Sequence, residues 1–118
     1  MPYVDGFVIP MPKKSLAAYR RIASAAGKIW MEHGALEYRE CIGDDIKTSM
    51  GLSFPKLTKA KANETVVFAW IVYRSKAQRN KVNAAVMKDP RMAKLMNVPM
   101  PFDCKKMTYG GFKTIVDL

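Results

Sequence analysis

Histidine and cysteine are scarce in this sequence, and their scarcity limits the chemistry it can support. The only histidine is His33, and the only cysteines are Cys41 and Cys104. Metal centres need several histidine, cysteine or carboxylate ligands that converge, so we expect no metal site and interpret His33 as a surface or helix-capping residue. The cysteines lie far apart and outside any Cys-x-x-Cys spacing, and we expect reduced, packed thiols rather than a disulfide.

Long apolar runs are also missing. The longest is Val66–Tyr73, far below the roughly 20 residues needed to span a bilayer. The N-terminal segment Met1–Gly6 has neither the basic region nor the apolar run of a secretory signal. We therefore expect a soluble protein of the cytoplasm with no membrane partner.

Motifs for nucleotide binding and covalent catalysis are absent. No P-loop or Rossmann glycine pattern occurs. Gly110 and Gly111 fall within a predicted strand and lack the following helix that a phosphate cradle requires. Nothing supports a Ser or Cys nucleophile paired with His33 and a third orienting group.

Acidic residues are scarce in the second half of the chain. Residues 1–45 carry six basic and six acidic side chains, so the net charge of +10 resides entirely in residues 46–118. Such asymmetry hints at an anionic partner, but we favour the alternative interpretation, a solvated surface that keeps the protein soluble. The basic residues of the second helical segment are Lys76, Arg79, Lys81, Lys88, Arg91 and Lys94.

What is present is enough for one globular domain. The chain has 118 residues, of which 49% are hydrophobic and 25% charged, values close to the average for soluble domains. A chain of this length buries enough apolar surface to fold as a single unit over residues 1–118.

Alternating apolar side chains predict four strands. The predicted strands are Tyr3–Met11, Ala35–Ile42, Glu64–Arg74 and Met107–Val116. We expect Pro10 and Pro12 to close the first strand, and Gly110-Gly111 to mark a bulge or a close backbone approach in the last. The weakly patterned connection 46–63 is long for so small a domain, so the second strand is expected to resume within it.

Apolar spacing of three and four residues predicts the helices. The first runs from an N-cap at Ser15 to His33 and ends at Gly34. A capping box, Ser75 with Gln78, opens a second helix that extends to Lys88. Asp89-Pro90 then starts a short helix through Met96. The resulting β-α-β-β-α-β order predicts a ferredoxin-like α+β fold, a four-stranded antiparallel sheet with two main helices.

The strand Glu64–Arg74 is apolar on both faces. Val66, Phe68, Trp70 and Val72 alternate with Val67, Ala69, Ile71 and Tyr73. Two helices cover one face of such a sheet, and soluble monomers rarely expose an apolar patch of several hundred Å² on the other. We therefore expect a homodimer in which two copies pack these open faces around a two-fold axis, giving a dimeric α+β barrel.

Several groups of residues occur in a characteristic order. They are Tyr3–Val8, Gly34–Leu36, Glu40-Cys41, Gly43–Asp45, Val66–Ile71, Asp89–Met92, Pro101–Asp103 with Met107, and Tyr109–Phe112. Together they resemble the YbaA-like family of small bacterial proteins of unknown function, within the dimeric α+β barrel superfamily. The resemblance covers nearly the whole chain and implies the fold and the homodimer, but no activity. Ile42 and Cys104 depart from it, standing where Trp and Gly are expected.

The superfamily includes haem-degrading and cofactor-free oxygenases. The haem degraders resemble one another in an Asn on the first strand, a Trp on the third and a His on the second helix. Trp70 matches the Trp, but the first predicted strand has no Asn and residues 75–96 contain no His. We expect no haem and assign no other cofactor, and we interpret Trp70 as a core residue.

Folds of this kind commonly hold small molecules between helices and sheet. The pocket candidates by position are His33, Glu37, Tyr38, Trp70, Arg74, Asp103 and Tyr109. Five methionines of the second half fill irregular gaps or suit an adaptable apolar pocket. They are Met87, Met92, Met96, Met100 and Met107.

Three functions stay open. The first is a small-molecule binder or a cofactor-free oxygenase or isomerase-like enzyme acting on a small apolar or aromatic ligand. The second is a structural or interaction dimer without chemistry. The third is a binder of an anionic polymer such as RNA, whose affinity would fall steeply with salt, although exposed aromatics interleaved with the basic residues are not evident.

Overall fold

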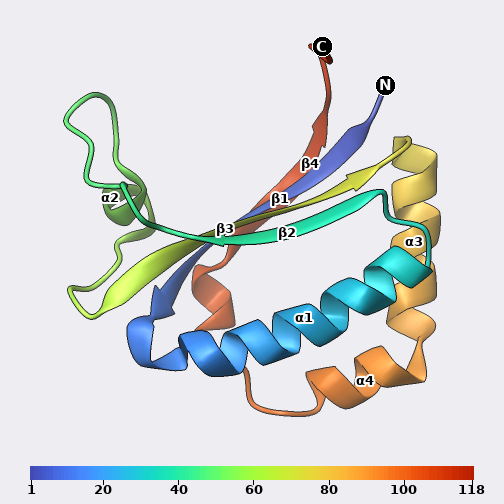
Figure 1. Ribbon diagram of the computed structural model, residues 1–118, viewed down its shortest axis with the longest axis horizontal. Coiled ribbons are helices and arrows are strands. Elements are labelled where there is room, and N and C mark those ends of the chain that lie inside the picture. The colour runs from blue at the N-terminus through green and yellow to red at the C-terminus, as the bar shows by residue number, and fades with distance from the viewer.

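The computed structural model describes residues 1–118 and shows the predicted order of main elements (Figure 1). The helices and strands are β1 (Tyr3–Pro12), α1 (Leu16–Glu32), β2 (Glu37–Ile42), α2 (Phe54–Thr58), β3 (Glu64–Tyr73), α3 (Lys76–Lys88), α4 (Pro90–Met96) and β4 (Thr108–Lys113). Two short 3-10 helices span Lys13–Ser15 and Cys104–Lys106. The ferredoxin-like α+β prediction is confirmed.

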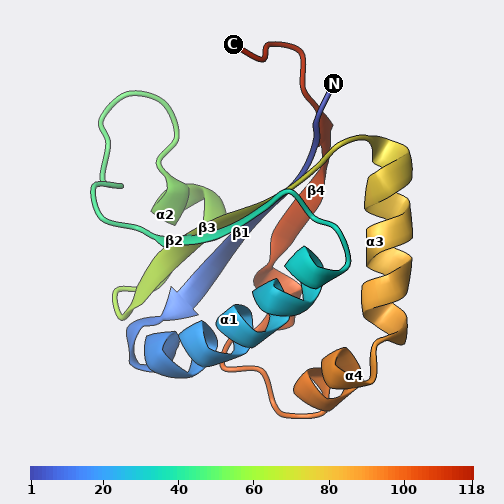
Figure 2. The same ribbon diagram turned by 45° about the vertical axis from the view of Figure 1, so that its right-hand side comes forward.

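The four strands form one antiparallel sheet in the order β2-β3-β1-β4. At its centre Gly6 of β1 faces Trp70 of β3 on one side and Gly110 of β4 on the other. The helices α1, α3 and α4 lie over one face of this sheet, as Figures 1 and 2 show from two directions. That arrangement places the core between one sheet face and three helices.

Alternate residues of the central strands fill this core. The buried side chains on the helix-covered face are Ile9 and Met11 of β1 and Val67, Ala69, Ile71 and Tyr73 of β3. Ile71 and Tyr73 pack in one cluster with buried residues of the helices, namely Ile29, Val82, Val86 and Met92. The other four form a second cluster, against which Leu16, Tyr19, Phe102 and Met107 pack. Burying each such side chain stabilises the fold by about 1.5–3 kcal/mol relative to exposure.

Most of the predicted helix ends are confirmed. Gly34 follows α1 with a φ of +116°, a conformation that favours glycine. Ser75 accepts a hydrogen bond from the Gln78 N–H (3.1 Å), and Asp89 accepts one from the Arg91 N–H (2.9 Å). The Ser15 prediction is wrong, because the 3-10 turn before α1 leaves Ser15 in a helical conformation with no side-chain cap bond.

β1 runs through Pro10, so the expectation that this proline closes the strand is wrong. Pro10 pairs with Val66 of β3. The Val66 carbonyl accepts a hydrogen bond from Gly43 N–H on the β2 side (2.8 Å), which means that the backbone polar groups of Val66 point away from β1. The pairing of Pro10 with β3 therefore needs no backbone N–H from this residue. On the other side of β1 no N–H is needed either, because the pairing with β4 stops at Val8.

Two further expectations need correction. β2 does not resume within residues 46–63; the segment instead forms the short helix α2, whose N-cap Ser53 accepts from the Lys56 N–H (3.4 Å). The cysteines are free, as predicted, but both Cys41 and Cys104 are exposed rather than packed.

The sheet face opposite α1 is apolar and largely uncovered. α2 covers one end of it, where Phe54 meets Phe68 edge to face with ring centroids 5.9 Å apart. Even with this contact Phe68 is 44% exposed, and Phe112, on β4, is 62% exposed. A shallow hollow of about 560 Å³ lies between these two rings, bordered by Val4 and Val8. The open face predicted from the sequence therefore exists.

Candidate functional site

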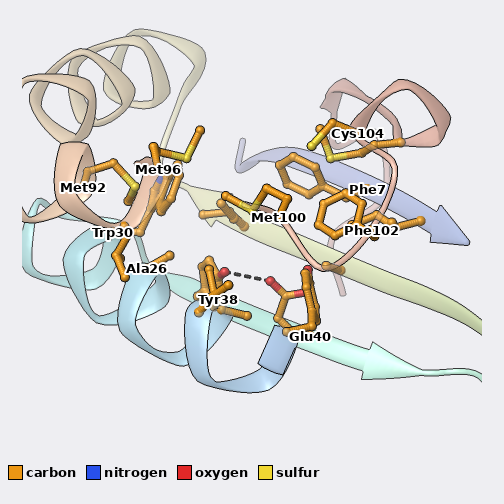
Figure 3. Close-up of a pocket in the computed structure, with 18 of the residues that line it drawn as sticks. Phe7, Ala26, Trp30, Tyr38, Glu40, Met92, Met96, Met100, Phe102 and Cys104 are labelled. Atoms are coloured by element: carbon orange, nitrogen blue, oxygen red, sulfur yellow. Dashed lines mark hydrogen bonds between the residues drawn. The ribbon is translucent and has the colours of Figure 1, made fainter. Parts of the chain in front are cut away.

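A cavity of about 250 Å³ lies between the sheet and the helices that cover it. Side chains from five parts of the chain point into it (Figure 3). β1 and β2 contribute Phe7, Tyr38 and Glu40, α1 contributes Ala26 and Trp30, α4 contributes Met92 and Met96, and the segment after α4 contributes Met100, Phe102 and Cys104. The lining is almost wholly apolar, so the cavity suits an apolar molecule.

The polar group of the cavity is a carboxylate held by two phenols. The Tyr19 hydroxyl donates to Glu40 Oε1 at 2.6 Å, and the Tyr38 hydroxyl donates to Glu40 Oε2 at 2.7 Å. Burial, together with the neighbouring Glu40 carboxylate, raises the pKa of both tyrosines far above the usual value for a phenol. Both hydroxyls therefore keep their protons at neutral pH.

A second polar network lies behind the Trp30 wall of the cavity. The Trp30 indole N–H and the Tyr73 hydroxyl both donate to Asn83 Oδ1 at 3.0 Å. Asp5, buried on the same sheet face, accepts from Arg79 Nε at 3.0 Å. Burial raises the pKa of Tyr73 well above that of a free phenol, with the Asp5 carboxylate as the next cause. This network fixes the indole ring that forms one end of the cavity.

The helix α4, whose Met92 and Met96 line the cavity, is attached to α1 by charged groups. Arg91 Nη1 contacts Glu32 at 2.6 Å, and Arg91 Nη2 contacts Asp89 at 2.9 Å. His33 Nε2 lies 2.8 Å from Asp89. Hydrogen bonds from Arg91, and next from His33, hold the pKa of Asp89 far below its usual range. The hydrogen bonds of Arg91 to Asp89, and next to Glu32, raise the pKa of Arg91.

Of the predicted pocket residues, Tyr38 places its side chain on the cavity floor. Trp70 borders the cavity, but its indole lies on the open face, where it donates to Glu37 Oε1 at 3.0 Å. Glu37 also accepts from Arg39 at 2.8 Å, and the Trp70 and Arg39 hydrogen bonds together lower the pKa of Glu37.

The other four predicted residues lie apart from this floor. His33 binds Asp89 at the end of α1. Arg74 is exposed after β3, and Asp103 accepts from the Lys105 N–H at 3.0 Å. Tyr109 stacks on Phe7 with ring centroids 5.9 Å apart and is largely exposed. The structure thus brings Glu37 and Trp70 together on the open face of the sheet. Tyr38 and Tyr109 lie on the helix-covered face, but of these two only Tyr38 lines the cavity.

Sequence reasoning missed Glu40, Tyr19 and Trp30. Glu40 stands two residues after Tyr38 in a strand, so the two side chains share a face. Because helices cover this face of the sheet, the Glu40 carboxylate on it needs a buried polar partner. The sequence could therefore have identified Glu40 as a site residue. Tyr19 and Trp30 recur at the three- and four-residue steps that define the apolar stripe of α1. Nothing in that spacing distinguishes residues that line a cavity from residues that fill a core.

Solved structures with this fold include SnoaB, a cofactor-independent oxygenase from Streptomyces nogalater. Its mutant superposes with a TM-score of 0.62 at 12% identity, over 98% of this chain and 96% of that chain. A dimeric ferredoxin-like protein from an uncultured marine organism superposes with a TM-score of 0.57 at 11% identity, over 99% and 98% of the two chains. Likeness at such low identity shows the fold alone, and it defines the class: a ferredoxin-like α+β domain.

The chain belongs to the family described as protein of unknown function (DUF1428), which matches residues 2–104. It is 45% identical to the uncharacterized protein YbaA of Escherichia coli strain K12 over 117 residues, which is 99% of each chain. The resemblance to the YbaA-like family is therefore confirmed. None of the helices combines the length and apolar character that a membrane crossing requires.

Proposed function

We propose that this protein is a homodimer that binds a small apolar or aromatic molecule in the cavity beneath α1 and α4. The cavity is the observation that carries this proposal. An apolar cavity of about 150 Å³ already accepts benzene. This one measures about 250 Å³, which is below the range of about 300–1,000 Å³ for drug-sized ligands. A bicyclic aromatic molecule is of the right size.

The lining favours a ligand of this kind over a well-packed core. Met92, Met96 and Met100 project into the cavity from α4 and the segment that follows it. Methionine side chains have flexible, polarizable thioethers that adjust to irregular shapes and make favourable contacts with aromatic rings. These three methionines therefore let the cavity adapt its shape to an apolar ligand.

Thermal shift and titration calorimetry with 2-naphthol test the binding proposal. We expect saturable binding that raises the melting temperature. Ala26→Leu fills part of the cavity and should weaken binding at least tenfold, whereas Ala17→Leu, the same change at an exposed position of α1, should leave it unchanged. Oxygen uptake measured on the same mixtures separates a cofactor-free oxygenase from a binding protein. Absence of binding, or equal loss in both variants, contradicts the proposal.

The homodimer is proposed from the open sheet face. Phe68 and Phe112 lie exposed there beside Val4 and Val8, and covering apolar surface of this kind contributes about 25 cal/mol per Å² before the entropic cost of association. The occupant we propose is the same face of a second copy, an arrangement that a two-fold axis completes. The dimeric ferredoxin-like protein of the same fold supports this choice.

Analytical ultracentrifugation tests the dimer. The wild-type chain should sediment at twice its mass of 13.3 kDa at micromolar concentration. Phe68→Asp should raise the dimer dissociation constant at least about 30-fold, as loss of a central interface aromatic does. Met31→Asp, on an exposed part of α1, is the matched control and should leave the dimer intact. A wild-type monomer would contradict the proposal.

The basic residues of α3 and α4 give weaker support to the alternative function, the binding of an anionic polymer such as RNA. Arg79 turns inward to Asp5 and lies over the Tyr3 ring with its guanidinium carbon 5.0 Å from the centroid. Arg91 is paired with Glu32 and Asp89. These two cations are therefore neutralised within the protein, which weakens the motive for a polymer-binding surface.

A further inference from the structure

We infer that the ligand carries a hydrogen-bond donor, an O–H or N–H group, which it directs at the Glu40 carboxylate. This inference rests on the proposed function, since it names the chemistry of the molecule that occupies the cavity. It follows from which polar atoms of the lining are already engaged and which are not.

The strong side-chain donors of the lining are engaged elsewhere. The protons of Tyr19 and Tyr38 are directed at Glu40. The Trp30 indole N–H is directed at Asn83, and the Trp70 indole N–H at Glu37 on the far face of the sheet. Arg39 contacts Glu37 at 2.8 Å through its Nε, also on the far face. A ligand carbonyl or carboxylate entering the cavity thus finds no free strong donor among these side chains.

Unused hydrogen-bond acceptors remain around the Glu40 carboxylate. A carboxylate offers about four lone-pair sites, and the Glu40 side chain uses one on each oxygen, at 2.6 Å to Tyr19 and 2.7 Å to Tyr38. Each tyrosine oxygen retains lone pairs as well, because both phenols act as donors here. The polar end of the cavity therefore accepts hydrogen bonds and does not offer them.

The charge of the cavity lining also favours a ligand that donates hydrogen bonds. The cavity contains the Glu40 carboxylate and no basic side chain that points inward, because the Arg39 guanidinium lies with Glu37 on the open face. An anionic ligand would have to shed its water next to a carboxylate in an apolar enclosure, which is strongly unfavourable. Neutral and cationic donors remain, and aromatic walls suit both.

Five bicyclic probes of similar size separate these cases in titration calorimetry. Naphthalene reports apolar binding alone. 2-Naphthol adds a hydroxyl donor, 2-methoxynaphthalene replaces that donor by an acceptor, tetrahydroisoquinoline supplies an ammonium, and 2-naphthoate supplies an anion. We expect 2-naphthol to bind at least tenfold more tightly than 2-methoxynaphthalene, and 2-naphthoate to bind more weakly than naphthalene. Tight binding of tetrahydroisoquinoline as well would extend recognition to cationic donors.

Two variants assign the preference to the carboxylate. Glu40→Gln keeps the shape of the side chain but removes its charge and introduces donor hydrogens, so the ratio of affinities for 2-naphthol and 2-methoxynaphthalene should fall to about one. Tyr19→Phe removes one donor to Glu40 and keeps the carboxylate, so the preference for 2-naphthol should persist even if the variant is less stable. Thermal unfolding of both variants establishes that they fold.

The outcomes separate this inference from the proposed function. If naphthalene, 2-naphthol and 2-methoxynaphthalene bind equally, or if the preference survives Glu40→Gln, the inference is overturned while the apolar cavity remains a binding site. If none of the five probes binds, the proposed function fails and the inference fails with it. A preference for the donor that disappears only in Glu40→Gln supports both.

Discussion

The ring of Tyr38 packs closely against Gly27. A Cβ atom at Gly27 would come within 2.7 Å of two Tyr38 ring carbons, closer than real side chains pack. The glycine in the middle of α1 thus permits the helix to approach β2 closely enough for the Tyr38 hydroxyl to reach Glu40 at 2.7 Å. Glycine weakens a helix interior, but at this position it allows the close packing that places Tyr38 beside Glu40.

Gly27→Ala tests this relationship. Alanine favours a helix interior over glycine by about 1 kcal/mol, but displacing the Tyr38 ring costs about 1–3 kcal/mol. We expect a net loss of stability of about 1 kcal/mol in urea unfolding and weaker binding of 2-naphthol. Ser24→Ala, at an exposed position of the same helix, should be neutral or slightly stabilising. A stabilised Gly27→Ala protein would show that the ring moves aside freely.

The buried pair of Asp5 and Arg79 should matter more for stability than its surface counterparts. Arg79→Met leaves the largely buried Asp5 carboxylate without its charged partner at 3.0 Å, and we expect a loss of about 2 kcal/mol in the free energy of unfolding. The control is Lys81→Met, an exposed position of α3, which should change stability by less than about 0.5 kcal/mol. Equal effects of the two substitutions would mean that the ion pair contributes nothing specific.

Asp89 should make stability depend on pH in acid. Its pKa is lowered in the folded protein by hydrogen bonds from Arg91 and His33, so it lies below the value of about 3.9 expected in the unfolded chain. A lowered folded pKa means that the stabilisation is complete above about pH 4 and is lost as the pH falls further. We expect Asp89→Asn, which keeps an N-cap side chain for α4, to flatten this loss between about pH 4 and pH 2 in urea titrations. An unchanged pH profile would contradict this assignment.

The exposed thiols provide a probe of cavity occupancy. Cys104 borders the cavity, whereas Cys41 is exposed on β2 and lies outside it. In a Cys41→Ser protein, saturating 2-naphthol should slow the reaction of Cys104 with a disulfide reagent several-fold. In a Cys104→Ser protein, the same ligand should leave the reaction of Cys41 unchanged. Equal rates with and without ligand at Cys104 would place the ligand elsewhere.

Strong local signals predicted most of the fold. The alternation in Glu64–Tyr73, the Ser75 and Asp89 caps and the glycine at residue 34 each act over a few residues, so they can be read from the sequence. The bulge expected at Gly110-Gly111 is absent, because β1 and β4 pair there in unbroken register. A Cβ at Gly111 would collide with side-chain atoms of Arg79 and Tyr3, so side chains rather than backbone approach this glycine closely. Residues 46–63 were misjudged, although the Ser53 cap and the proline in the first turn of α2 are local signals. The packing of Phe54 against Phe68, which holds α2 on the sheet, is a tertiary contact that no local pattern shows.

The site was harder to predict than the fold. Trp70 and Tyr38 come from neighbouring strands, and only the register, which pairs Tyr38 with Ile71, shows that their side chains lie on opposite faces. The Glu40 contact to Tyr19 joins residues 21 positions apart. Long-range pairings of this kind arise from tertiary packing, and no periodicity in the sequence records them.

A crystal structure of the protein grown with 2-naphthol would test the central claim most directly. Our account predicts a naphthalene ring between Trp30 and Phe102, with its hydroxyl within hydrogen-bonding distance of a Glu40 oxygen. An unoccupied cavity filled by shifted methionine side chains, or a bound ring whose hydroxyl points away from Glu40, would contradict it.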